Sequence, residues 1–70
     1  MEALQIFAQT EVDEENKSYQ LQRNSLKYYR AATFKAGKFL SATKFKPDFD
    51  DAWFDFNQIR NGARLVTTDV

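Results

Sequence analysis

Four carboxylates follow the single proline of this 70-residue chain closely enough to be candidates for a metal site or an acid/base pair. They are Asp48, Asp50, Asp51 and Asp55. A hard cation needs several oxygens that converge on one point. If the segment is helical, Asp48 and Asp50 lie in its first turn, where carboxylates accept hydrogen bonds from free backbone N–H groups. We therefore expect these aspartates to cap a helix and not to bind a metal.

The residue types that most catalytic and cofactor sites need are missing. The chain has no cysteine and no histidine, which excludes disulfides, Cys/His zinc sites and histidine acid/base pairs. Its two isolated glycines cannot form a phosphate-binding loop or a dinucleotide fingerprint. We expect a protein that is not an enzyme, with no catalytic residues and no cofactor.

A block of basic residues interleaved with aromatic residues is the feature most suggestive of function. Residues 17–46 hold eight Lys or Arg and no Asp or Glu, whereas residues 1–15 and 48–55 hold five and four acids and no base. The aromatic residues within the block are Tyr19, Tyr28, Tyr29, Phe34, Phe39 and Phe45. Lys and Arg neutralise phosphates while aromatic rings stack on bases, so the block can bind single-stranded nucleic acid.

The same block has a plainer interpretation. Its aromatic residues would form the core of a small domain, and its lysines would be the solvated face. The net charge of zero favours this interpretation, because nucleic-acid-binding domains are usually basic overall.

The length predicts one domain, residues 1–70, with a thin core that needs good packing or a partner. We therefore expect another protein or a second copy as partner, with nucleic acid as a further candidate. No stretch approaches the roughly 18 apolar residues of a membrane span, and residues 1–12 lack the pattern of a signal peptide. We expect no membrane partner and a location in the cytoplasm or an organelle stroma.

The segment after Pro47 predicts a helix over residues 50–61. Apolar residues recur there at helical spacing, and the aspartates crowd its first turn. Arg60 falls in the last turn, and Asn61-Gly62 is a typical C-terminal stop. On this helix we expect Trp53 to face the core and Phe54 to be exposed.

The central segment has two interpretations. As a hairpin, residues 26–35 and 38–46 are strands around an Ala36-Gly37 turn. As a helix, the segment gains from its high-propensity alanines, Ala31, Ala32, Ala36 and Ala42. Residues 3–12 are compatible with either a strand or a short helix.

Residues 39–62 resemble the junction between two tetratricopeptide repeats. In that family an aromatic, a small residue, a proline, a tryptophan and a large apolar residue follow one another at fixed spacing. Here these positions are Phe39, Ala42, Pro47, Trp53 and Phe56. The resemblance extends more loosely back to about residue 14, and over residues 14–62 the chain departs from the pattern at Arg23, Lys35 and Asn57, where small residues are expected.

The resemblance favours helix for the central segment and implies an all-α fold. We expect helices near residues 14–28, 30–45 and 50–61, which form a helical core over 14–62 between an N-terminal extension, 1–13, and a C-terminal tail, 63–70. The alternative is an α+β fold with a central β-hairpin and one helix.

The leading functional prediction is a small non-catalytic protein-interaction module, acting as a subunit, adaptor or inhibitor. It would dock through an exposed aromatic and basic surface. The candidate partner-binding residues are Tyr28, Arg30, Lys35, Lys38, Phe54 and Arg60. The alternative is a small single-stranded nucleic-acid-binding protein that uses residues 17–46.

Overall fold

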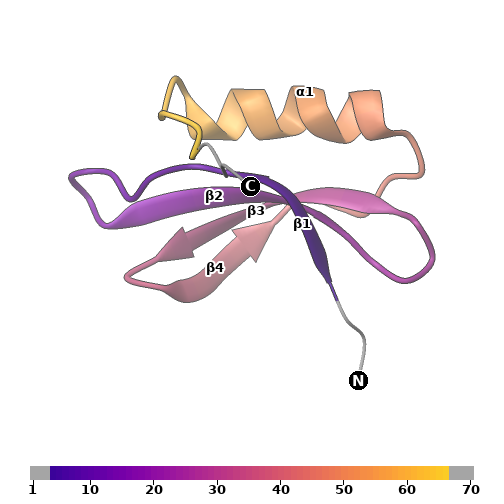
Figure 1. Cartoon of the computed structure of the whole chain (residues 1–70), viewed down its shortest axis with the longest axis horizontal. Coiled ribbons are helices and arrows are strands. Elements are labelled where there is room, and N and C mark those ends of the chain that lie inside the picture. Colours follow the sequence, from indigo (N-terminus) through magenta and orange to yellow (C-terminus); the bar gives the residue numbers. More distant parts are fainter. Residues whose placement is uncertain (1–3, 67–70) are drawn as a thin grey trace.

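A four-stranded antiparallel sheet with one helix on one face makes up the fold in the computed structural model, which describes residues 4–66 (Figure 1). The strands lie in sequence order across the sheet. Their bounds are β1 Gln5–Gln9, β2 Lys17–Arg23, β3 Tyr29–Lys35 and β4 Lys38–Ala42, and the helix α1 is Phe49–Arg60. The helix packs against β2 and β3. Within the described residues, no helix is long and apolar enough to cross a membrane.

The predicted all-α fold and the likeness to tetratricopeptide repeats are therefore wrong. Residues 14–28 and 30–45, expected as two helices, hold β2, β3 and β4. The α+β alternative describes the molecule, and its hairpin is β3 and β4 around Ala36-Gly37. Both turn residues have positive φ, 52° and 80°, as in the two-residue turn that matches the twist of a hairpin. A continuous helix cannot pass through two such residues.

The alanines that favoured a helix are explained by packing. Ala31 and Ala32 are neighbours on β3 and point to opposite faces of the sheet, yet both are fully buried. Ala31 lies under the helix, in one cluster with Ala52 of α1. A small side chain on each element lets helix and sheet approach closely, so these alanines reflect limited space and not helix propensity.

The core lies between α1 and the sheet. Leu21 of β2 pairs with Ala31 of β3, and both are fully buried against Phe56 of the helix. Half-buried residues surround this centre: Ala8, Tyr19, Tyr29, Trp53, Ile59 and Leu65. Trp53 thus packs against the core as expected, while Phe54 on the next position is 63% exposed, also as expected.

The helix prediction is confirmed to within one residue at each end. Asp48 caps the N-terminus and its side chain accepts a hydrogen bond from the backbone N–H of Asp50. Arg60 lies in the last turn, and Asn61 ends the helix in the left-handed conformation. Among the described residues no group of acids is arranged to hold a metal ion.

The segments on either side of the expected helical core join the sheet. Residues 5–9, expected within an N-terminal extension, form the edge strand β1, so of the two alternatives for residues 3–12 the strand is found. Part of the expected tail pairs with that strand, since Thr10 bridges Leu65 and the Val66 N–H donates to the Gln9 carbonyl oxygen at 2.8 Å. Residues 1–3 and 67–70 lie outside the described part of the chain.

A substitution at Ala36 distinguishes a hairpin turn from a helix, because it changes the free energy of unfolding in opposite directions in the two. Asparagine adopts positive φ more readily than alanine and is preferred before glycine in this turn. We expect Ala36→Asn to raise the free energy of unfolding by about 0.5–1 kcal/mol, measured by urea denaturation. In a helix the same change would lower it by roughly 0.5 kcal/mol. The matched control is Ala42→Asn on β4, which should bring no gain; equal losses in both variants would contradict the turn.

Candidate functional site

In the described part of the chain, residues 4–66, one face of the sheet has no helix over it (Figure 1). The strand register identifies the side chains on this face, because cross-strand partners point the same way. Leu21 and Ala31 point to the helix, so the pair Gln22 and Arg30 beside them points away. We call this surface the open face. On β2, β3 and β4 it consists of Ser18, Gln20, Gln22, Arg30, Ala32, Phe34, Phe39 and Ala42.

The sheet carries positive charge and no negative charge. The four strands contain five basic residues and no Asp or Glu. Every carboxylate side chain of residues 4–66 lies either between β1 and β2 or in the segment 48–55 of the helix. The alternating charge blocks of the sequence are therefore separated in space, with bases on the sheet and acids on the helix and one loop.

Arg30 is held in place at the centre of the open face. Its Nε–H donates to Oε1 of Gln22 at 2.8 Å, and Nε2 of Gln22 donates to Oε1 of Gln20 at 2.9 Å. The guanidinium carbon lies 5.2 Å from the ring centre of Phe39 and 4.7 Å from that of Phe45. Cation–π contacts and the glutamine chain together fix the direction of the guanidinium.

A β-bulge brings two phenylalanines together beside this arginine. Thr33 pairs with Ser41, but Phe34 pairs with Phe39, so Leu40 is an extra residue on β4. In a regular strand without this bulge, Leu40 would pair with Phe34 and Phe39 would point to the helix side. With it, Phe34 and Phe39 meet edge to face at 5.9 Å on the open face, where Phe39 remains 54% exposed. The bulge thus builds an aromatic platform next to Arg30.

An ion pair joins the chain after β4 to the acidic helix. Lys46 Nζ lies 2.5 Å from Oδ2 of Asp55, and the Lys46 backbone pairs with that of Tyr29 on β3. The hydrogen bond that Lys46 donates to Asp55, and the nearby charges of Asp55 and Asp51, raise the pKa of Lys46. Lys46 therefore serves the contact between sheet and helix and not the open face.

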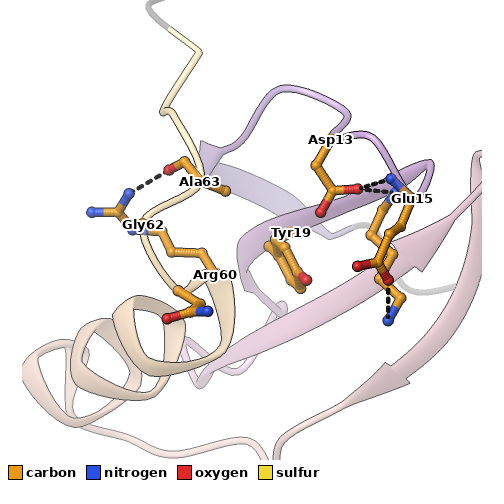
Figure 2. Close-up of a pocket in the computed structure, with 8 residues that line it drawn as sticks. Asp13, Glu15, Tyr19, Arg60, Gly62 and Ala63 are labelled. Carbon is orange, nitrogen blue, oxygen red and sulfur yellow. Dashed lines mark hydrogen bonds and ion pairs between the residues drawn. The ribbon is translucent and has the colours of Figure 1, made fainter.

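A hollow of about 310 Å³ lies between the helix end and the β1–β2 turn, with Tyr19 between them (Figure 2). Its charged side chains already have hydrogen-bond or ion-pair partners within the protein. Asp13 accepts the backbone N–H groups of Glu15 and Lys17 at 2.8 and 2.9 Å. The Glu15 carboxylate lies 3.5 Å from Lys17 Nζ, and Arg60 donates to the carbonyl oxygen of Ala63 at 2.6 Å. These contacts stabilise the turn and the helix end.

The six residues predicted to bind a partner do not share one surface. Arg30 is on the open face, and Lys35 and Lys38 pair across the end of the β3–β4 hairpin. Tyr28 lies in the loop before β3. Phe54 points to solvent from the helix, and Arg60 folds back on its own helix end. Only Arg30 of this set meets the aromatic platform.

The residues of the supposed repeat motif serve several purposes. Phe39 and Ala42 lie on β4, and Pro47 precedes the helix. Trp53 and Phe56 are ring neighbours on α1, 5.6 Å apart. Their spacing is real, but the first two belong to a bulged strand and not to a helix.

Sequence reasoning missed Gln20 and Gln22, which orient Arg30. The signal for them is present in the alternation of residues 18–22, where Tyr19 and Leu21 alternate with Ser18, Gln20 and Gln22. That alternation is typical of a strand with one face against a core.

Comparison of the chain with protein-family models, with curated proteins and with solved structures finds no match.

The ion pair between Lys46 and Asp55 predicts how stability depends on alkaline pH. Because the pKa of Lys46 is raised in the folded state, the stabilisation is fully present below the unfolded-state pKa, and it is lost as pH rises through the higher folded-state pKa. We expect the free energy of unfolding to fall more for the unaltered protein than for Asp55→Asn between about pH 9 and pH 12. Urea denaturation at each pH measures this.

Asp50→Asn is the matched control, because Asp50 lies on the same helix but does not pair with Lys46. Its pH profile should follow that of the unaltered protein. Parallel profiles for the unaltered protein and Asp55→Asn would contradict the role of the ion pair.

Proposed function

We propose that this protein binds single-stranded nucleic acid on the open face of its sheet. The observation that carries the proposal is Arg30, which is fixed by Gln22 and lies over the exposed ring of Phe39 on a sheet that has no carboxylate. Exposed rings offer stacking surfaces to unpaired bases, and arginine and lysine neutralise the backbone between them. In duplex nucleic acid the bases are stacked on one another and are not free to stack on such a platform.

The neutral net charge is compatible with this proposal because the charges are segregated. Lys35 and Lys38 pair next to Phe34 and Phe39, so their side chains leave the sheet on the opposite side, at the hairpin end, and Lys44 follows β4. A polyanion on the open face therefore meets Arg30 first. The acids of α1 lie beyond the sheet, and screening limits their effect to about 8–10 Å at moderate salt.

Docking to another protein is the second candidate. The edge strand β4 favours it, since all five of its residues are exposed and Leu40 among them is 54% exposed. However, β4 carries a bulge and begins with Lys38, two features that discourage pairing with a further strand. The open face therefore supports nucleic acid better than the strand edge supports a protein.

Titration of a fluorescein-labelled oligothymidine of about 12 nucleotides tests the proposal by anisotropy. We expect Phe39→Ala to weaken binding about 5- to 150-fold, as removal of one stacking ring costs roughly 1–3 kcal/mol. Affinity should also fall linearly with the logarithm of salt concentration. The matched control is Phe54→Ala, which removes an equally exposed ring from the helix and should leave the affinity unchanged.

Circular dichroism of both variants serves to check that they remain folded. Absence of binding by the unaltered protein at about 20 mM salt would overturn the proposal, since electrostatic binding is strongest there. Equal losses in Phe39→Ala and Phe54→Ala would show that the open face is not the site.

A further inference from the structure

Arg30 has unused hydrogen-bond donors that point to base selectivity. The guanidinium has five N–H groups, of which only Nε–H is bound to Gln22. Among residues 4–66, neither Nη atom of Arg30 donates a hydrogen bond, and no carboxylate forms an ion pair with this side chain. Its outer end therefore offers two parallel N–H groups with fixed direction.

We propose that Arg30 makes the open face selective for guanine, by donating from Nη1 and Nη2 to O6 and N7 of the base. This inference rests on the nucleic-acid function proposed above and names the base that the site prefers. Guanine presents these two acceptors side by side, and a bidentate arginine contact to them is the commonest specific contact of arginine with a base.

The geometry favours a base over a phosphate as the ligand of this arginine. A phosphate can be bound by a charge alone, as lysine binds it, and does not require a guanidinium of fixed direction. Arg30 instead lies over the rings of Phe39 and Phe45, held by Gln22. A base stacked beside it on the aromatic platform presents its edge to the guanidinium, so that hydrogen bonds can form in the plane of the base.

The other bases match these donors less well. Adenine places an N–H₂ group next to N7, and that donor faces the donors of arginine. Thymine offers O4 with no second acceptor beside it on that edge. Cytosine does have adjacent acceptors, N3 and O2, but its single ring stacks over a smaller area than a purine.

Binding of oligothymidines with one substituted central base tests the inference. The central positions are guanine, adenine, cytosine and thymine, and a single guanine avoids self-association of guanine-rich strands. We expect the oligonucleotide with guanine to bind about 5- to 150-fold more tightly than those with thymine or adenine, the range for one bidentate pair. Replacement of guanine by 7-deazaguanine, which lacks N7, should remove most of this preference without any change to the protein.

Arg30→Lys keeps the charge but loses the bidentate geometry, so it should lower the guanine preference, measured as the ratio of the guanine to the thymine affinity, to near one. Arg23→Lys is the matched control. Arg23 lies over Phe7 and donates to Gln5 at the opposite edge of the sheet, and its replacement should preserve the preference.

Failure of this inference differs from failure of the proposed function. If thymine strands bind through Phe39 but guanine binds no more tightly, or cytosine binds best, guanine selectivity is overturned and the binding face stands. Retention of the full preference with 7-deazaguanine or in Arg30→Lys would equally overturn it. If no oligonucleotide binds at low salt, both proposals are wrong.

Discussion

Phe56 of the single helix packs on Leu21 and Ala31, and this contact decides what each side of the sheet does. A helix covers only one face of a sheet, so burial of this cluster leaves the other face to solvent. Residues 4–66 supply no second layer for that face. It must satisfy its own polar groups and pack its own side chains. The chain does this with the glutamine–arginine series across β2 and β3 and with rings from β3 and β4.

The bulge in β4 makes sense within this division. In a strand of regular register Phe39 would pair with Lys35 and point to the helix side, where α1 makes no contact with β4. The extra residue Leu40 does the opposite and keeps Phe39 on the open face, half exposed. Bulges commonly re-aim a side chain in this way near functional sites. In a domain with so small a core, an aromatic ring held in solvent is a cost that binding would explain.

The helix and its caps could be predicted because the signals are local: aspartates in the first turn, apolar residues at helical spacing and Asn61-Gly62 at the end. The secondary structure of the central segment could not be predicted, because alanine both favours helices and allows strands and helices to pack closely. Three different constraints explain three of these alanines. Ala31 is buried beneath the helix, Ala32 is buried on the open face, and Ala36 has the positive φ of the turn. The spacing of Phe39, Pro47 and Trp53 misled because a proline before a helix is common to many folds. The better evidence was the alternation along residues 18–22, which also holds the two glutamines of the site.

Charge separation links the fold to the proposed site more closely than net charge does. The layers of a helix and a sheet lie about 10 Å apart, roughly one screening length at moderate salt. The acids of α1 therefore reduce the positive potential of the open face only weakly, while they repel a polyanion from the helix side. Lys46 neutralises Asp55, the acid whose ion pair links the helix to the chain beyond β4. The proposed function therefore places the polyanion on the open face, away from the acids of α1, and the position of the helix determines which face that is.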